Sequence, residues 1–157
     1  MRGNSRIVDM LNDILTGELT AVNQYFLGAK IARHRGYEHL AHKIYDEALG
    51  EMKHAERLME RILYLDGLPN VQKLEKVRVG EGVVEQLRLD LDTEKQSVQR
   101  LNAGIELARK HADNGTAELL EDLLGSAEGH VDWLQTQVTL VKDLGDTQYL
   151  AQQLHKG

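Results

Sequence analysis

The chain has 157 residues, 41% of them hydrophobic and 28% charged, so we expect residues 1–157 to form a single domain with a packed core. A formal net charge of −6 argues against a nucleic-acid binder and against a basic membrane-surface module. The absence of cysteine excludes disulfides and thiol chemistry. No apolar run approaches the roughly 20 residues that span a bilayer. Residues 1–9 lack the apolar core of a signal peptide, so we expect a cytoplasmic protein.

Helix signals predict four long helices and a short fifth one. Asn4 or Ser5 can cap the first helix and Gly36 can end it, while the only proline, Pro69, follows the second. The long stretch after Pro69 shows no clear helical period, and Gly115 lies between the last two long helices. The predicted helices cover about residues 4–35, 38–66, 83–113, 116–144 and 147–154.

Each long helix carries one apolar stripe at i, i+3, i+4, i+7 spacing, which is typical of helices that bury one face. Two short connections and one long crossover, over residues 70–82, join the four helices. The crossover is long enough for the second and third helices to run in the same direction. The sequence therefore predicts an all-α fold, a four-helix bundle with a short C-terminal fifth helix.

Acidic and histidine side chains interrupt the stripes near the middle of the helices. Burying an ionised carboxylate without partners costs several kcal/mol or more, so such groups pair, bind a proton or bind metal. Glu51 and His54 have i, i+3 spacing and therefore share one helix face. The interrupting residues are Glu18, Glu51, His54, Glu94 and His130.

This set approaches the ligand set of a di-iron carboxylate bundle, in which two helices each give a glutamate and two each give Glu-x-x-His. Oxygen and imidazole ligands together suit iron. A single Glu-x-x-His is common on helix surfaces, and buried Glu–His pairs can be purely structural. The combination on four core faces favours a metal centre.

Several segments carry a resemblance to the bacterioferritin family that extends over essentially the whole chain. They are residues 17–27, 51–57, 61–70, 128–134 and 148–150, which include GELTAVNQYFL, EMKHAER and EGHVDWL. The resemblance implies a ferritin-like bundle and a hollow cage of twenty-four subunits that stores ferric mineral. It also implies a ferroxidase centre in each subunit, b-type haem between paired subunits, and an electron donor for iron release.

Matched by position, the resemblance implies that Glu51 bridges two irons, with Glu18 and His54 at one site and Glu94 and His130 at the other. The second bridging carboxylate belongs three residues before His130, where this chain has Ala127. Among its neighbours in sequence, Glu128 points about 100° away around the helix, Glu121 lies on the opposite face, and Asp122 lies roughly 12 Å along the axis.

The missing bridge leaves two hypotheses open. In the first, the oxidase centre is impaired, and the chain acts in mixed cages beside a second bacterioferritin subunit with a complete site. In the second, the five surviving ligands suffice, and the chain forms a homo-oligomeric ferroxidase that oxidises Fe(II) with O2. A remote third hypothesis is a metal-free helical interaction protein.

Met52 follows Glu51 and points about 100° away from the metal face. Two outward apolar stripes accompany it, which predicts that the first two helices associate with another copy. They are Tyr45, Leu49, Met52, Ala55 and Met59 on the second helix, and Leu15, Leu19, Val22 and Phe26 on the first. Interface packing alone explains Met52. With the family resemblance, two Met52 sulfurs become the axial ligands of one haem b.

Tyr25 and Trp133 lie near the predicted centre and are candidate electron relays, although core packing explains both as well. In many relatives a histidine and an aspartate on the second helix bind iron from the cavity side. Here those places hold Asp46 and Gly50, so we expect this inner site to be incomplete.

Overall fold

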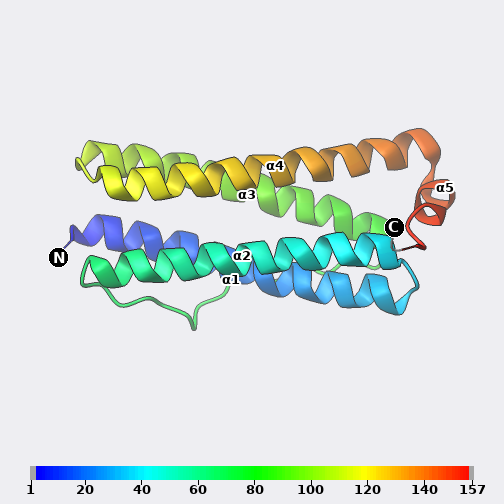
Figure 1. Cartoon of the computed structure of the whole chain (residues 1–157), viewed down its shortest axis with the longest axis horizontal. Helices are drawn as coiled ribbons and strands as arrows, with labels where there is room; N and C mark the ends of the chain where they lie inside the picture. The colour runs from blue at the N-terminus through cyan, green and yellow to red at the C-terminus, as the bar shows by residue number, and fades with distance from the viewer. Residues whose placement is uncertain (1–2, 156–157) are drawn as a thin grey trace.

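The computed structural model describes residues 3–155, which form four long helices and one short one (Figure 1). Residues 1–2 and 156–157, which the sequence analysis assigned to the same domain, lie outside the described residues. The helices are α1 (Ser5–His34), α2 (Glu38–Tyr64), α3 (Val83–Lys110), α4 (Asn114–Leu144) and α5 (Asp146–Ala151).

Helix boundaries follow local capping. The Asn4 side chain accepts a hydrogen bond of 2.8 Å from the backbone N–H of Arg6, which satisfies one free donor at the start of α1. The predicted third helix was three residues too long. Ala112 adopts a φ of +56°, and the Asp113 side chain caps α4 by accepting from the backbone N–H of Thr116 at 3.1 Å. The cap residue therefore belongs to the next helix.

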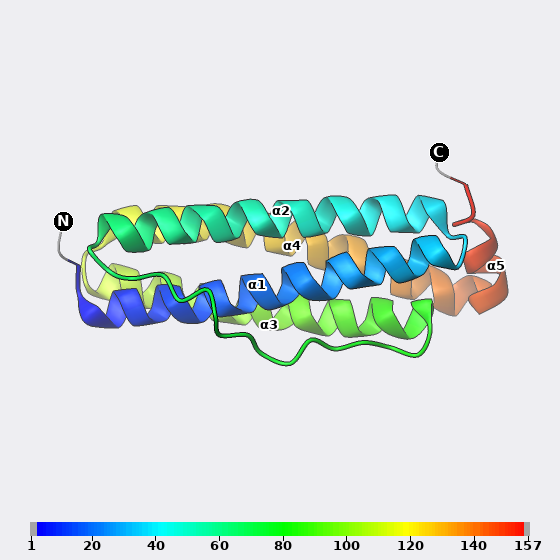
Figure 2. The same cartoon turned by 90° about the horizontal axis from the view of Figure 1, so that it is seen from below.

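The chain forms two antiparallel hairpins, α1–α2 and α3–α4, joined by a connection that runs the length of the bundle (Figure 2). This connection brings the chain back to the far end, so α2 and α3 run in the same direction, as the sequence predicts. Side chains of the bundle hold this connection in place. Thr20 Oγ1 accepts from the backbone N–H of Glu75 at 2.9 Å, and Gln24 Oε1 accepts from that of Arg78 at 3.1 Å.

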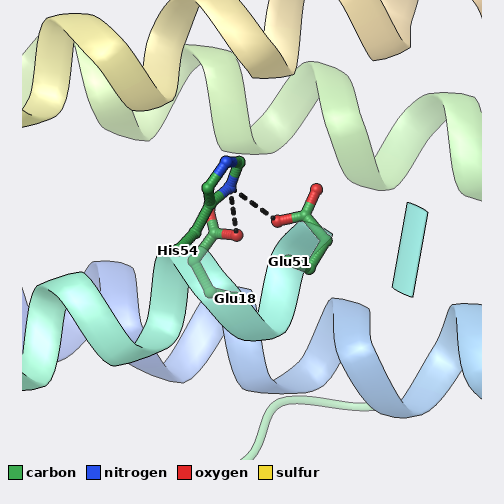
Figure 3. Close-up of side chains that lie close together, drawn as sticks. All are labelled: Glu18, Glu51 and His54. Carbon is green, nitrogen blue, oxygen red and sulfur yellow. Dashed lines mark ion pairs between the residues drawn. The ribbon is translucent and has the colours of Figure 1, made fainter. Parts of the chain in front are cut away.

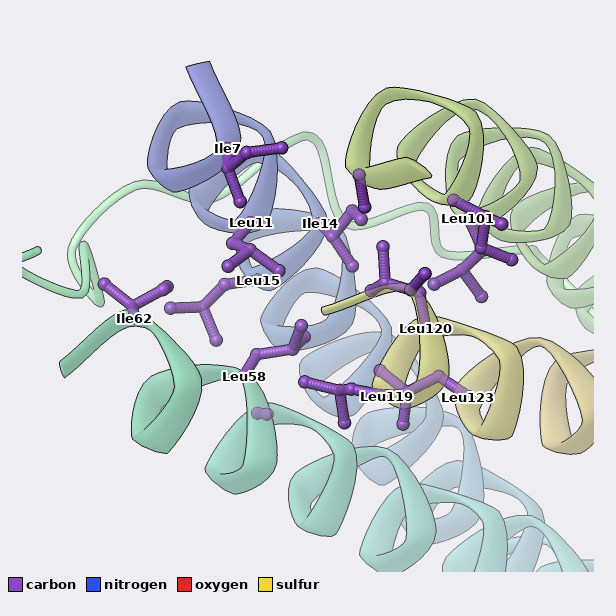
Figure 4. Close-up of a cluster of buried hydrophobic side chains, with 14 of the residues drawn as sticks. Ile7, Leu11, Ile14, Leu15, Leu58, Ile62, Leu101, Leu119, Leu120 and Leu123 are labelled. Carbon is purple, nitrogen blue, oxygen red and sulfur yellow. The ribbon is translucent and has the colours of Figure 1, made fainter. Parts of the chain in front are cut away.

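Two separate hydrophobic clusters form the core. One fills the end of the bundle that contains the start of α1, where Leu11, Leu58, Leu101 and Leu120 converge from four helices (Figure 4). The other fills the opposite end, around Tyr25 and Leu134. All four long helices contribute to both clusters, so the gap between them is a layer across the middle of the bundle.

The short α5 packs at the end of the bundle opposite the start of α1 (Figure 1). Tyr149 is fully buried there, and its hydroxyl donates to Oε1 of Gln137 on α4 at 2.7 Å. The backbone N–H of His39 donates to the carbonyl of Gln153 at 3.1 Å, which ties the C-terminal segment to the start of α2. Over residues 3–155, no helix has the length and apolar character needed to cross a membrane.

Candidate metal centre

A layer of ionisable side chains separates the two hydrophobic clusters. Along α1, for example, Leu15 belongs to one cluster, Ala21 to the other, and Glu18 lies between them. Each long helix breaks its apolar stripe at the same level of the bundle. The residues predicted as metal ligands therefore do meet: Glu18 from α1, Glu51 and His54 from α2, Glu94 from α3 and His130 from α4.

The first group consists of Glu18, Glu51 and His54, whose side chains point toward one another (Figure 3). Nδ1 of His54 lies 3.6 Å from Oε2 of Glu18 and 3.3 Å from Oε2 of Glu51. Both carboxylates are buried, and Oε2 of Glu18 has no hydrogen-bond partner among the described residues. Each of the three residues offers a ligand atom within 4.8 Å of the others, so together they could hold a metal ion.

The second group consists of Glu51, Glu94 and His130, all buried. Nδ1 of His130 lies 3.1 Å from Oε1 of Glu94. Neither Oε2 of Glu94 nor Nδ1 of His130 has a hydrogen-bond partner within residues 3–155, although buried polar atoms are almost always partnered. Glu51 belongs to both groups, so one carboxylate lies between two adjacent places for a cation.

The protonation states fit a site that loses protons when it takes up metal. Burial, followed by the neighbouring Glu18 and Glu94 carboxylates, raises the pKa of Glu51 well above its usual range. Burial works against ionising Glu94 too, but His130, with hydrogen bonds from Glu51 and Tyr25, outweighs burial and lowers the pKa of Glu94. Burial lowers and Glu94 raises the pKa of His130, with a net rise. These shifts favour the proton on Glu51 and an ion pair between Glu94 and His130.

Two aromatic residues contact the second group. Tyr25 is fully buried, its hydroxyl donates to Oε1 of Glu94 at 2.6 Å, and its ring meets the His130 imidazole edge-on at 5.2 Å. Trp133 stacks on the His130 ring, with the ring centres 6.2 Å apart. Both residues therefore contact the second group, and their role as electron relays stays a prediction.

Position 127 contributes no ligand, because the side chain of alanine has no donor atom. Ala127 is 3% exposed, and its methyl group belongs to the hydrophobic cluster. The sequence predicts no substitute among the neighbours of Ala127 on its own helix. A carboxylate approaches instead from α2, where Oε2 of Glu47 lies 3.5 Å from Nδ1 of His130. Sequence reasoning missed Glu47 as a site residue. The available signal was its i, i+4 spacing to Glu51 on the inner stripe of α2.

The outer face of the first hairpin differs in part from the prediction. Met52 is 38% exposed, and Leu49 on the same helix and Phe26 on α1 are exposed as well. Leu15 and Ala55, which the sequence placed on the outer stripes, are fully buried in the core. Their helices present wide apolar faces, and periodicity alone does not fix where the core ends and the surface begins.

The residues at the inner-site positions do not form a metal group. Asp46 is exposed and pairs with His42, its Oδ2 lying 3.6 Å from Nε2 of that histidine. Gly50 has no side chain, and nothing lies within 4 Å of where a Cβ would be.

The comparisons with known proteins agree with this geometry. Residues 8–144 match the family model described as the ferritin-like domain. The chain is 45% identical over 151 residues to a bacterioferritin of Streptomyces coelicolor, covering 96% of this chain and 90% of the relative. It is 43% identical to a bacterioferritin of Mycobacterium leprae, covering 97% and 96%, and 37% identical to one of Brucella melitensis, covering 95% and 92%. The chain belongs to the bacterioferritins, a branch of the ferritin-like family.

Proposed function

We propose that this chain is a subunit of an oligomeric iron-storage cage and that the middle of its bundle binds Fe(II) as a substrate for oxidation. The observation that carries the proposal is the pair of buried ligand groups that share Glu51. The relatives named bacterioferritins support it, because they match nearly the whole chain, including the segments that supply these ligands.

The ligand chemistry suits iron. Carboxylate oxygens prefer hard cations, and each group adds one imidazole, which brings the affinity for first-row transition metals. Two adjacent ferrous ions supply one electron each, so they reduce one O2, with two protons, to hydrogen peroxide and leave two ferric ions. Glu51 lies between the two places and is the bridging ligand. Tyr25 and Trp133 are the electron relays.

The missing carboxylate at position 127 makes this oxidation slower than in a centre with two bridging glutamates. An anionic bridge stabilises the ferric pair more than the ferrous pair, so losing one weakens the driving force. Ala127 therefore favours a chain that acts in mixed cages, where a second kind of subunit with a complete site does most of the oxidation. The alternative is a homo-oligomeric cage in which the surviving ligands suffice.

Met52 is the residue that would bind haem b. Met52 is exposed on an apolar face beside Leu49, where its soft thioether would be available to hold the haem iron. One chain offers one such sulfur, so a second copy related by a two-fold axis would supply the other. The haem would serve electron transfer from an outside donor when stored iron is released.

Iron loading tests this proposal. The purified assembly receives Fe(II) in air, and we expect ferric iron to elute with the protein at many ions per subunit. The key variant is Glu51→Gln, which removes the carboxylate that both ligand groups share. It should lose most protein-dependent oxidation. The control is Glu56→Gln, the same change at an exposed position of the same helix.

The outcomes separate the alternatives. Slow loading by the chain alone, corrected on adding a bacterioferritin subunit with a complete site, supports mixed cages. Fast loading by the chain alone supports the homo-oligomeric ferroxidase. No loading in either case, with Glu51→Gln equal to the parent, contradicts the proposal and favours a metal-free interaction protein.

A further inference from the structure

Glu47 occupies the place from which a carboxylate can replace the one missing at position 127. Its Oε2 lies 3.5 Å from Nδ1 of His130, and Oε1 of Glu94 lies 3.1 Å from the same nitrogen. Ligand atoms on one metal ion, bonded at about 2.1 Å and separated by roughly 90–110°, lie about 3.0–3.4 Å apart. Each of the two carboxylates therefore lies from Nδ1 of His130 at about the distance that separates two ligands of one cation.

The neighbours of Glu47 hold its carboxylate in this orientation. Oε1 of Glu47 lies 3.3 Å from Nζ of Lys43, which leaves Oε2 on the side of His130. The Lys43 ammonium in turn lies 5.4 Å from the centre of the Trp133 ring, and Trp133 stacks on His130. These four side chains form a closed ring of contacts between α2 and α4.

An open hollow connects this position with solvent. Glu47, Glu51, His54, His130 and Trp133 contribute to its lining, and three small residues keep it open: Gly50, Ser126 and Gly129. The Glu47 side chain is 23% exposed, whereas that of His130 is 4% exposed. Glu47 thus lies between the solvent and the buried ligands, where an entering cation meets it first.

We propose that Glu47 is a ligand of the second metal ion, together with Glu94 and His130, and that it supplies the charge, but not the bridge, of the carboxylate absent at position 127. It is a terminal ligand on the His130 side, and Glu51 remains the bridging ligand. Glu47 raises the number of carboxylates at the centre from three to four, which balances the charge of two divalent ions. This inference rests on the proposed function.

Cobalt(II) tests it without relying on oxidation. Co(II) reports its own ligands through visible d–d absorption, and equilibrium dialysis gives its stoichiometry. We expect the parent assembly to bind two Co(II) per subunit. Glu47→Gln should weaken the second ion about tenfold or more and change its spectrum, as loss of a metal-site residue does. Glu56→Gln, the same change on an exposed part of α2, should leave both unchanged.

A second background isolates the role of Glu47. In the Ala127→Glu protein α4 supplies the missing carboxylate, so Glu47→Gln should then change the second affinity by less than about threefold. The inference is overturned if the parent and Glu47→Gln bind Co(II) equally. It is also overturned if both proteins bind only one Co(II) per subunit. A parent that binds no Co(II) overturns the proposed function itself. Glu47→Ala is a second variant, in which no glutamine amide can take the place of the carboxylate. Added acetate should restore the binding of the second ion to Glu47→Ala.

Discussion

The phenol of Tyr25 on α1 donates a 2.6 Å hydrogen bond to Oε1 of Glu94 on α3. The same carboxylate oxygen lies 3.1 Å from Nδ1 of His130 on α4. Burial, with the charge of Glu94 next, raises the pKa of Tyr25 well above its usual value, so the phenol stays protonated and remains a donor. The hydrogen bond from Tyr25 therefore fixes the orientation of the Glu94 carboxylate, a candidate metal ligand on α3 that contacts side chains of α1 and α4.

Replacing Tyr25 by Phe tests this contact. The variant leaves a buried carboxylate without its donor, so we expect the free energy of unfolding to fall by about 1–3 kcal/mol. If Tyr25 is also an electron relay, the rate of Fe(II) oxidation should fall severalfold while the Co(II) stoichiometry stays at two per subunit. Stopped-flow absorbance and dialysis measure the two effects separately. Tyr37→Phe, away from the centre, is the control, and an unchanged oxidation rate in Tyr25→Phe would contradict the relay.

Haem binding should depend on Met52. Met52→Leu keeps the apolar surface but removes the sulfur, so we expect the assembly to lose haem b at stoichiometric loading, seen as loss of the bound-haem Soret band. Met59→Leu on the same helix is the matched control, because Met59 packs against the core. Retention of haem with unchanged spectra in Met52→Leu would show that another residue is the axial ligand.

The buried carboxyl group of Asp90 should make the free energy of unfolding depend on pH. It is buried, and Gln24 and Gln86 both donate to its Oδ1, at 2.8 and 2.9 Å. Burial outweighs these bonds and raises the pKa of Asp90 from 3.8 to about 6. Between pH 4 and 6 the folded chain holds a proton that the unfolded chain releases, so stability falls as pH rises. This difference in pKa corresponds to about 3 kcal/mol.

Asp90→Asn removes this dependence and keeps an acceptor oxygen for both glutamines. We expect the variant to gain stability over the parent as the pH rises from 4 to 7, by up to about 3 kcal/mol. Urea unfolding at a fixed protein concentration across this range measures the difference. Asp143→Asn, an exposed position on α4, should track the parent at every pH. A constant difference between Asp90→Asn and the parent would rule out Asp90 as the titrating group.

Local sequence pattern predicted the fold and the meeting of the five candidate ligands, because each depends on spacing within one helix. The stripes predicted four long helices, and their interruptions at Glu18, Glu51, Glu94 and His130 predicted a polar layer at one level of the bundle. The long connection after Pro69 predicted the parallel course of α2 and α3. These features need no knowledge of how two helices face each other.

Contacts between helices were the part that sequence did not predict. Glu47 lies on the same inner stripe as Glu51, but only the closeness of α2 to α4 brings it to His130. The burial of Asp90 likewise depends on glutamines from two helices. Leu15 and Ala55 were assigned to the outside, because a helix with two apolar faces does not reveal which one the bundle covers.

We propose above that the middle of this bundle oxidises iron and that Ala127 limits the rate. The most direct measurement is the initial rate of O2-dependent Fe(II) oxidation by the purified assembly and by its Ala127→Glu variant, at equal Fe(II) per subunit. We predict a slow parent that is still faster than buffer, and a variant faster by about tenfold or more, as for restoring a lost metal-site residue. Equal, fast rates would contradict the limiting role of Ala127, and no protein-dependent oxidation in either would contradict the centre itself.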